Sequence, residues 1–594
     1  MALSINAEAP AAAGDAGRSE RVWRVAACVA VVVAVLGHVW VAWSSIAAGT
    51  PSFNFDEVAS LLPGRAVLGY PTPEVGGSGY FPLSAILMAP IWWFTSDPMA
   101  FYRTALVTSI VIGLVAVWPL ARIASRFGLT NAQAVTVAAI VMALPARTVQ
   151  AEYVLAEKSL FLVVALTGLA AVRLVERPSY SRVLLVSLGV ATAYFSHARM
   201  ITVVVAALVW LLVFTLRHVR IGLVGLVSLV AFTWVARTVA LHVIGLVTHF
   251  RQGNNFDDVL SGLRPGLLAR TVLGQSWEQV VSSFGLVALG AVVVVVLLAR
   301  EARRRSPGPV LFLVLATGAL FAGSTIDWAQ QDQLWPTETR VRLDVWIYGR
   351  YVDPLFALVT LVALAAVVVG VRRRQVWIAA AVNVAIVGAT VLWLAQDAPT
   401  GGTLTPAHAP GAAAFDWALP HHAIRTGMIP WFTNDNRFWL IASLVALVPT
   451  AVLLVARHRP LVVLAVVLAL GAAGTVTANI ASTHFHDERA HRQPLIGVLR
   501  HIEQQHPGTT VSYFFRCPRG ADAQPAWRNR YAWALLPTVV EADPDADIVI
   551  ACPEHPAAGQ PGTVPLIDWA GAFPAWVRPG PLQDALRAEG LLQR

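Results

Sequence analysis

Residues 23 to 47 read WRVAACVAVVVAVLGHVWVAWSSIA, a stretch in which Arg24 is the single charged side chain. A helix needs about 20 mostly apolar residues to cross the hydrocarbon core of a bilayer. The stretch is too long, and too rich in tryptophan near its end, for a cleaved signal peptide. It therefore predicts a membrane-spanning helix near the start of the chain.

The composition extends this prediction to the whole chain. Of 594 residues, 57% are hydrophobic and 13% are charged, against about 25% charged in ordinary soluble proteins. The mean hydropathy is +0.63. We expect a polytopic α-helical membrane protein with about 13 transmembrane helices, near 23–47, 100–121, 131–147, 154–174, 181–197, 199–216, 219–247, 279–299, 309–326, 351–371, 375–396, 437–456 and 460–481. The shorter apolar stretch 83–95 ends in aromatic residues and predicts an interfacial helix.

The placement of arginine predicts the orientation. With the N-terminus in the cytoplasm, every inside loop is short and carries at least two arginines, as the positive-inside rule requires. These arginines are Arg18, Arg21 and Arg24; Arg122 and Arg126; Arg173, Arg177 and Arg182; Arg217 and Arg220; Arg300, Arg303, Arg304 and Arg305; Arg372, Arg373 and Arg374; Arg457 and Arg459. The net charge of +9 is thereby explained by topology in the plasma membrane, and we expect no nucleic-acid partner.

Three regions follow from this pattern. Residues 1–22 are expected to form a disordered cytoplasmic tail, 23–482 a transmembrane domain, and 483–594 a small extracytoplasmic α/β domain. The last region has helix-like stretches at 493–505 and 581–593, strand-like stretches at 509–516 and 546–551, and a mixed segment at 527–541. Cys517 and Cys552 each follow a strand-like stretch, and in an exported domain they are candidates for a disulfide; two free thiols are the alternative.

The first outer loop, 48–99, begins with Pro51-Ser-Phe-Asn-Phe-Asp56-Glu57 directly after the first span. Charged groups at a membrane edge are expensive and indicate candidate functional sites. Adjacent carboxylates there suit a general base or the ligands of a divalent cation. The alternative is structural, because acids are also favoured in the first turn of a helix.

The loop continues with Gly69-Tyr-Pro-Thr-Pro-Glu74, a glycine-rich turn at 76–79, and Tyr80-Phe-Pro82-Leu83. An acidic pair, a Gly/Pro/Tyr stretch and a Pro-Leu entry to a short helix resemble the GT-C superfamily of membrane glycosyltransferases. The Asp-Glu form looks most like the protein O-mannosyltransferases and the lipid A aminoarabinose transferases, and actinobacterial arabinosyltransferases are relatives. The sequence departs from many members in having Phe81-Pro82 where they have two prolines.

The resemblance implies a polyprenyl-phosphate-linked sugar as donor, used on the outer face of the membrane to modify a cell-envelope glycan, lipid or protein. Asp56 is then the expected general base, and Glu57 a helper or a metal ligand. No cofactor is implied with certainty, although a divalent cation by these acids is compatible with the pattern. The strong preference for arginine over lysine points to a GC-rich genome, such as that of an actinobacterium.

Further candidates lie at the outer ends of later spans. Arg350 lies between Tyr348 and Tyr351, where an arginine can bind a phosphate through two hydrogen bonds; a snorkelling interfacial anchor is the alternative. His197 and Arg199 occupy a short outer turn and are expected to reach the donor phosphate or the acceptor, unless they form a plain polar turn.

The fourth span opens with Glu152, Glu157 and Lys158, the single lysine among 43 basic residues. Phosphate binding or pairing with Glu157 would explain this lysine, and a neutral ion pair without a catalytic part is the alternative. Weaker candidates are Asp327, Asp332 and Trp335 before the tenth span, and His484 and His486 after the last one.

Other classes of function compete with the glycosyltransferase. A lipid or polyprenol transporter or flippase would carry polar groups at mid-membrane, where this chain has few. An oligosaccharide ligase would centre on a late outer loop such as 397–436, which holds His408, His421, His422 and Arg425. A non-catalytic scaffold is the third alternative, against which the intact acids of the first loop argue.

Overall fold

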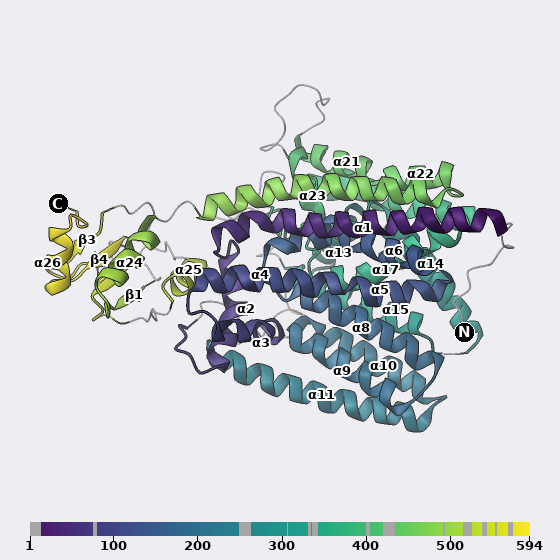
Figure 1. Cartoon of the computed structure of the whole chain (residues 1–594). Coiled ribbons are helices and arrows are strands. Elements are labelled where there is room, and N and C mark those ends of the chain that lie inside the picture. The colour runs from purple at the N-terminus through teal and green to yellow at the C-terminus, as the bar shows by residue number, and fades with distance from the viewer. Residues whose placement is uncertain are drawn as a thin grey trace.

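The computed structural model describes residues 13–74, 80–248, 263–305, 307–330, 334, 342–398, 404–419, 434–490, 494–514, 525–536, 543, 545–552, 555–556, 558–567 and 574–593. Long helices pack side by side into a bundle, and a small domain with a β-sheet lies at one end of it (Figure 1). The chain is a multi-span membrane protein.

Nine helices or helix runs within the described residues are long and apolar enough to cross a membrane, and two bent pairs raise the number to 11. The sequence predicts 13, a count that is not confirmed. The expected spans 181–197 and 351–371 are helices α9 (Tyr180–Ser196) and α17 (Asp353–Val369), each of 17 residues. The other long helices are α1 (Ala13–Ala48), α4 (Pro98–Val115) with α5 (Val117–Ala124), α8 (Glu157–Glu176), α10 (Ile201–Thr215), α11 (Val219–Gly245), α15 (Pro309–Trp328), α18 (Arg373–Ala389), α21 (Asn434–Ala446) with α22 (Val448–Ala456), and α23 (Pro460–Ala490).

The first bent pair joins α6 (Asn131–Ala143) to α7 (Pro145–Thr148) and η3 (Val149–Glu152) at an angle of 67°. Leu144 at the break has extended backbone dihedrals, which a residue before proline favours. After the break the chain packs against α1 and α4. It carries Glu152 to the neighbourhood of the first loop.

The second bent pair joins α13 (Pro265–Ser282) to α14 (Leu286–Arg303) at an angle of 103°. Phe284 and Gly285 make the bend with positive φ angles of 51° and 76°. The sequence predicts a loop over 248–278, and for 265–278 this is wrong. The segment contains the polar residues Arg270, Gln275 and Glu278. They lower its average hydropathy, and a search for apolar stretches therefore does not detect the helix.

Two short helices lie at the end of the bundle near the C-terminal region (Figure 1). Helix α2 (Asn54–Val67) contains the acidic pair, and α3 (Leu83–Met88) with η1 (Ala89–Trp93) forms the short apolar helix expected at 83–95. Gly64 of α2 lies against the backbone of Ala85 in α3, so closely that a Cβ atom at this position would meet the Ala85 carbonyl. The remaining short elements are η2 (Ser125–Phe127), η4 (Ala198–Met200), η5 (Thr390–Leu394), α19 (Ala395–Asp397), α20 (Pro410–Ala413) and η6 (Asp416–Ala418).

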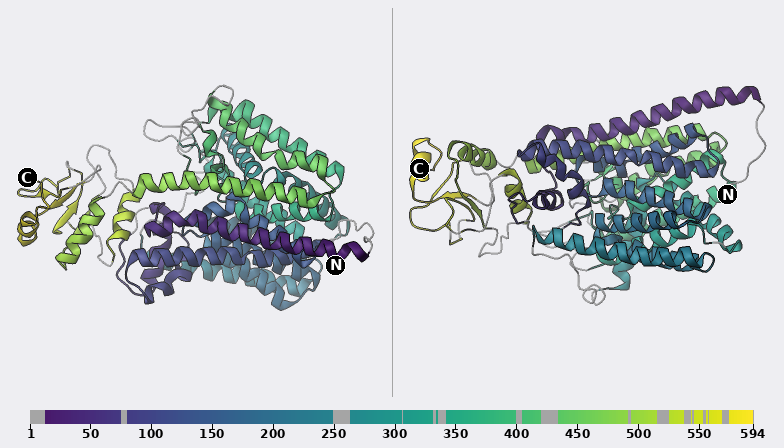
Figure 2. Two further views of the ribbon diagram at one scale, coloured as in Figure 1. Left: turned by 45° about the horizontal axis from the view of Figure 1, so that its top comes forward. Right: turned by 60° about the horizontal axis from the view of Figure 1, so that its bottom comes forward.

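The C-terminal region is a mixed α/β unit. Strands β1 (Val511–Tyr513) and β2 (Ile548–Ile550) pair in parallel, with Val511 opposite Ile548, and the order of the sheet is β1-β2-β4-β3. Strands β3 (Val564–Pro565) and β4 (Ala575–Val577) are not predicted from the sequence. Helices α24 (Pro494–Gln505), α25 (Pro525–Ala534) and α26 (Pro581–Ala588) complete the region, which stays at one end of the bundle in both views of Figure 2.

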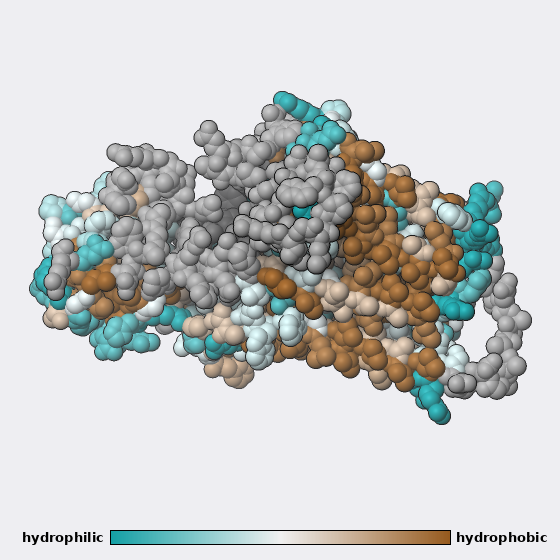
Figure 3. All heavy atoms as spheres, turned by 90° about the horizontal axis from the view of Figure 1, so that it is seen from above, coloured by the Kyte–Doolittle hydropathy of each residue, from teal (hydrophilic) through white to brown (hydrophobic). Residues whose placement is uncertain are grey.

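The surface of the bundle has the polarity of a membrane protein. A hydrophobic surface covers the middle, and hydrophilic residues gather at the end away from the C-terminal region (Figure 3). Arginines of the predicted inside loops meet at this end, where Arg217 donates to the Arg304 carbonyl at 3.1 Å. Arg126 lies 3.3 Å from Glu176 there.

Candidate functional site

The acidic pair lies in the first turn of helix α2, at the end of the bundle near the C-terminal region (Figure 1). The backbone N–H groups of Asp56 and Glu57 donate to the Phe53 carbonyl, which starts the helix. Both side chains are buried, Asp56 at 4% and Glu57 at 0% relative exposure. Consecutive residues of a helix point about 100° apart, and the two carboxylates therefore enter different surroundings.

Asp56 faces a buried arginine from a distant part of the chain. Arg350 Nη1 lies 2.6 Å from Asp56 Oδ2, and Arg350 Nε lies 2.7 Å from Glu157 Oε1. Burial lowers the pKa of Arg350, but Glu157, Tyr348 and Asp56 raise it more, so that its pKa is well above the ordinary value. The guanidinium is therefore a permanent positive charge between two carboxylates.

A second arginine completes this group. Arg199, in the turn between α9 and α10, places Nη2 3.1 Å from Glu157 Oε1. Its guanidinium carbon lies 4.3 Å from the centre of the Tyr351 ring, a cation–π arrangement. Two arginines and two carboxylates thus form one buried cluster, which we call the Arg350 cluster (Asp56, Glu157, Arg199 and Arg350).

Aromatic rings and a histidine surround the cluster. His197 lies edge-on between Tyr80, at 5.8 Å between ring centres, and Tyr351, at 5.6 Å. Burial first, and the charge of Arg199 next, lower the pKa of His197 well below its ordinary value, so its ring is neutral near pH 7. Its Nδ1 accepts from the Arg199 backbone N–H at 3.3 Å, which leaves the proton on Nε2.

Several hydrogen-bond donors of Arg350, Arg199 and His197 have no hydrogen-bond partner among the described residues. Among the described residues, no hydrogen-bond partner is found for Arg350 Nη2, Arg199 Nε and Nη1, or His197 Nε2. Buried donors without partners cost free energy, and such groups are concentrated at functional sites. Two guanidinium groups and an imidazole N–H with free donors are chemically suited to an oxyanion such as a phosphate.

Glu57 belongs to a separate network on another side of α2. Its carboxylate accepts from the Tyr102 hydroxyl at 2.6 Å, the Val154 N–H at 2.8 Å and the Phe53 N–H at 2.9 Å. Glu152 is near this network, with Oε1 3.5 Å from the Ser45 hydroxyl. The structure therefore separates Glu57 and Glu152 from the Arg350 cluster.

Lys158 also lies outside the Arg350 cluster. Its ammonium donates to the Ser109 hydroxyl at 2.9 Å and to the carbonyls of Tyr153 at 2.9 Å and Ala151 at 3.2 Å. These bonds use its three N–H donors. The expected neighbour Glu157 instead pairs with Arg350 and Arg199.

The two acids of the first loop do not converge on a common point. Asp56 pairs with Arg350, whereas both oxygens of Glu57 accept hydrogen bonds from protein groups. Within the described part of the chain, no three His, Cys, Asp or Glu residues are grouped as metal ligands. The donor set thus does not fit a divalent cation held by both acids.

The structure adds residues that the sequence analysis did not assign to a site. Arg342 and Asp344 form a two-point ion pair at 2.9 and 2.8 Å, and His408 Nδ1 lies 2.6 Å from Asp344. Burial raises the pKa of Asp344, but Arg342 and His408 lower it more, so that it stays below its ordinary range. His408 Nδ1 also lies 2.9 Å from Arg342 Nη2. Because a protonated Nδ1 cannot accept, we take the bond to the carboxylate as the one formed.

His408 also fixes the loop that carries Arg350. Its carbonyl accepts from the backbone N–H groups of Gly349 and Arg350 at 3.1 and 3.0 Å. The sequence marks His408 only as one of several histidines in a late loop. Its role in holding this turn depends on a contact across about 60 residues and has no local signal.

A further polar cluster lies deeper in the bundle and was also missed. Gln279 Nε2 donates to Glu278 at 2.6 Å and to Asp353 at 2.9 Å, and Arg147 Nη2 donates to the Asp353 carbonyl at 3.2 Å. An ionisable residue inside a membrane-spanning segment indicates a functional site. The sequence does not give this indication for Glu278, because the predicted span 279–299 begins one residue after it.

Some expected candidates lie outside the described residues: Asp332, Trp335, His421, His422, Arg425 and Cys517. Cys552 is buried at 4% relative exposure, and its pairing with Cys517 stays a prediction. Asp327 is described, at the end of α15.

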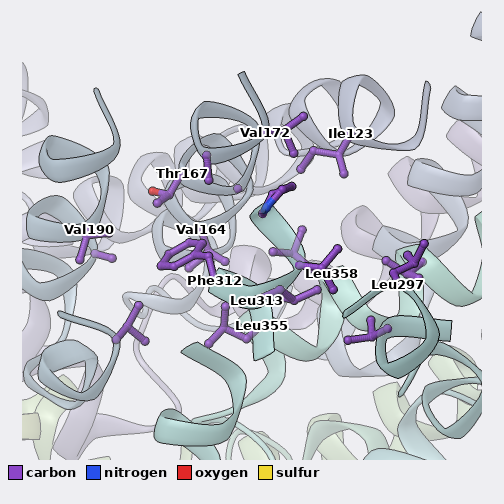
Figure 4. Close-up of a pocket in the computed structure, with 18 of the residues that line it drawn as sticks. Ile123, Val164, Thr167, Val172, Val190, Leu297, Phe312, Leu313, Leu355 and Leu358 are labelled. Carbon is purple, nitrogen blue, oxygen red and sulfur yellow. The ribbon is translucent and has the colours of Figure 1, made fainter. Parts of the chain in front are cut away.

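An apolar cavity lies away from this chemistry. Residues of α8, α9, α15 and α17 line it, among them Val164, Val190, Phe312 and Leu358 (Figure 4). Its volume is about 70 Å³.

Known proteins resemble the chain in structure rather than in sequence. No protein-family model and no curated protein match it. Among solved structures, ArnT from Cupriavidus metallidurans bound to undecaprenyl phosphate is 14% identical, with a TM-score of 0.45, over 96% of this chain and 99% of that one.

Two further structures are similar over smaller shares of their own length. The archaeal oligosaccharyltransferase AglB from Archaeoglobus fulgidus, in complex with an inhibitory peptide and a dolichol-phosphate, is 15% identical, with a TM-score of 0.37, over 67% of this chain and 58% of that one. Arabinosyltransferase EmbB from Mycobacterium smegmatis is 16% identical, with a TM-score of 0.35, over 92% of this chain and 45% of that one. All three belong to the GT-C superfamily, which is the superfamily that the first loop resembles.

Proposed function

We propose that the chain is a membrane glycosyltransferase that transfers a sugar, hexosyl or pentosyl, from a polyprenyl-phosphate donor to a cell-envelope acceptor on the outer face of the plasma membrane. The observation that carries the proposal is the Arg350 cluster, in which buried cations with free donors lie beside the Asp56 carboxylate. The N-terminus is then cytoplasmic and the C-terminal domain, 483–594, extracytoplasmic.

The cationic side of the cluster suits the donor phosphate. Arg350 Nη2, Arg199 Nε and Nη1, and His197 Nε2 have no partner among the described residues and can bind oxygen. A phosphate is already a good leaving group and needs no carboxylic acid to protonate it, unlike the leaving group of a glycoside hydrolase. Fixed positive charge that stabilises the departing phosphate is what promotes the reaction.

The anionic side suits the acceptor. An inverting transfer needs one base to remove the proton from the acceptor hydroxyl while its oxygen attacks the anomeric carbon. Asp56 is this base in our proposal. When the donor phosphate binds Arg350, it competes with Asp56 for the guanidinium, which frees the carboxylate to accept the proton. Glu157 keeps Arg350 and Arg199 in place.

The test is sugar transfer by purified Asp56→Asn protein with labelled polyprenyl-phosphate donors carrying arabinose, mannose, glucose or aminoarabinose. Because an amide cannot accept the proton, we expect transfer to fall by about 10²- to 10⁴-fold, the usual contribution of a general base. The matched control is Asp584→Asn, the same change at an exposed position of α26, and it should keep full activity. Full transfer by Asp56→Asn would refute the mechanism. Movement of intact donor across the bilayer without transfer would favour a flippase.

A further inference from the structure

At the far end of α2 from Asp56, Arg65 is buried at 4% relative exposure. Nine residues separate the two positions, or about 13 Å along a helix that rises 1.5 Å per residue. The position is therefore distinct from the Arg350 cluster, and a ligand bound there is independent of the proposed function.

The guanidinium of Arg65 is held rigidly. Its central carbon lies 4.7 Å from the ring centre of Trp92 and 5.3 Å from that of Tyr70, and its Nε donates to the Pro71 carbonyl at 2.9 Å. These contacts leave the two terminal amino groups of the guanidinium available for two-point binding of an oxyanion.

No carboxylate neutralises this charge in the described part of the chain, where the ion pairs do not include Arg65. Cation–π contacts stabilise the charge, but they supply no hydrogen-bond acceptors to the two terminal amino groups, which are not fully enclosed by protein atoms. The site is thus built for an anion.

The surroundings indicate which anion. Arg65 opens into a hollow of about 520 Å³, which is also lined by Thr95 and Ser96. On its rim, Trp93 is 64% exposed and Phe94 is 86% exposed. Large exposed aromatic side chains next to a membrane-spanning helix are typical of headgroup depth, and α2 and α3 lie at the end of the bundle near the C-terminal domain (Figure 1).

We propose that this hollow binds the phosphate of an anionic phospholipid headgroup. Arg65 binds the phosphate oxygens through its terminal amino groups, the Thr95 hydroxyl donates a further bond, and Trp93 and Phe94 lie against the upper part of the acyl chains. A free phosphate ion shares the first two contacts but not the third, so the aromatic rim separates the two sources.

The test is native mass spectrometry of the full chain in detergent, titrated with phosphatidylglycerol, with phosphatidylcholine, or with inorganic phosphate. We expect the wild-type protein to retain phosphatidylglycerol at least tenfold better than phosphatidylcholine. Arg65→Gln should lose this preference, and Arg65→Lys should keep part of it as a point charge. Trp93→Ala/Phe94→Ala, which changes only exposed rings, should weaken phosphatidylglycerol binding several-fold.

The matched control is Arg103→Gln. Arg103 lies at the same end of the bundle, but its guanidinium already donates to the carbonyls of Ile46 and Ala47, so we expect unchanged lipid binding. Equal retention of phosphatidylglycerol by wild type and Arg65→Gln would overturn the proposal. So would displacement of the lipid by millimolar phosphate with no effect of the aromatic variant, which would assign a free phosphate instead. If Arg65→Gln fails to fold, the aromatic variant alone decides the outcome.

Discussion

Asp56 and Glu57 are adjacent in the chain and both buried at the start of α2, but each carboxylate has its own partners. The pair predicts a functional or capping position after the first span. Arg350 is the partner of Asp56, and Tyr102 is a partner of Glu57. Because both partners come from distant parts of the chain, the sequence does not show that the two acids have separate surroundings. Their chemical roles stay predictions.

The different surroundings lead to a prediction about Glu57→Gln. The Glu57 carboxylate accepts three hydrogen bonds on its two oxygens, whereas a glutamine must turn its NH₂ group toward one of these donors. We expect the variant to lose about 1–3 kcal/mol of stability, the cost of a buried unsatisfied donor, and to keep measurable transfer activity. The measurement is the thermal unfolding temperature in detergent of Glu57→Gln, compared with those of the wild-type protein and Asp56→Asn.

The expected contrast is a stable, inactive Asp56→Asn protein and a destabilised, partly active Glu57→Gln protein. If Glu57→Gln unfolds at the wild-type temperature but has no activity, Glu57 acts in the chemistry and our separation of the two acids is wrong.

Lys158 shows how a sequence signal can be real while its predicted interpretation is not supported. A lone lysine in an arginine-rich chain suggests a special requirement, and phosphate binding was one explanation. The structure offers another: the break between η3 and α8 leaves the carbonyls of Ala151 and Tyr153 without helical partners, and the ammonium donates to both. A compact ammonium with three donors suits this position better than a planar guanidinium.

At the scale of elements, the turn that carries Arg350 depends on close packing. Gly349 lies so near the Glu278 carboxylate that a Cβ atom at this position would collide with it. Glu278 cannot easily withdraw, since it is fully buried and its carboxylate is held by Gln279 and the Gly411 N–H. The glycine is therefore required by space rather than by its backbone dihedrals.

Gly349→Ala should displace the Arg350 turn and reduce sugar transfer by about 10- to 100-fold, because a shift of about 1 Å in a reacting group can cost this much. The control is Gly318→Ala in α15, where no atom lies within 4 Å of the added Cβ and alanine is the better helix former. Transfer assays on both variants check the prediction. Equal activity of the two would show that the turn tolerates the displacement.

Elements themselves were predictable where hydropathy was high and uniform. The nine long helices or helix runs of the described residues and the short apolar helix Leu83–Trp93 fall where the sequence places them, whereas the predicted span 279–299 crosses the bend at Phe284 and Gly285. Helix α13 was missed because its polar side lines the interior of the protein, so the average hydropathy of the segment is low. The bends at Leu144 and Phe284 follow local backbone preferences, but their direction is set by packing.

At the scale of the whole molecule, the composition predicts a helical bundle with one arginine-rich end, and the structure has this arrangement. The candidate site could be predicted only as separate fragments. Asp56 and Arg350 are 294 residues apart in sequence, and no pattern within a single loop indicates their ion pair. Two further contacts were missed for the same reason: Arg147 donates to the Asp353 carbonyl across 206 residues, and His408 reaches Asp344 across 64.

The C-terminal domain contacts the bundle beside the candidate site. Trp533 of α25 is buried at 1% relative exposure and lies edge-on against Phe101 and Tyr102 of α4, with ring centres 5.7 and 6.4 Å away. Arg500 of α24 strengthens this contact, since its Nη1 lies 2.8 Å from Met99 Sδ and its Nη2 lies 3.9 Å from Asp97. Tyr102 in turn donates to Glu57, and α25 also packs directly against α2, where Trp533 and Leu536 share a core with Val58 and Leu62.

We expect Trp533→Ala to loosen the C-terminal domain and to reduce sugar transfer while the membrane bundle stays folded. Removing a buried tryptophan costs about 3–5 kcal/mol, and here the loss falls on the contact between domain and bundle. Hydrogen exchange over 525–536 should rise in the variant, and transfer should fall several-fold. Trp377→Ala, at a half-exposed position on α18, removes the same side chain from the lipid-facing surface and should change neither. Faster exchange with full activity would mean that the domain does not position α2.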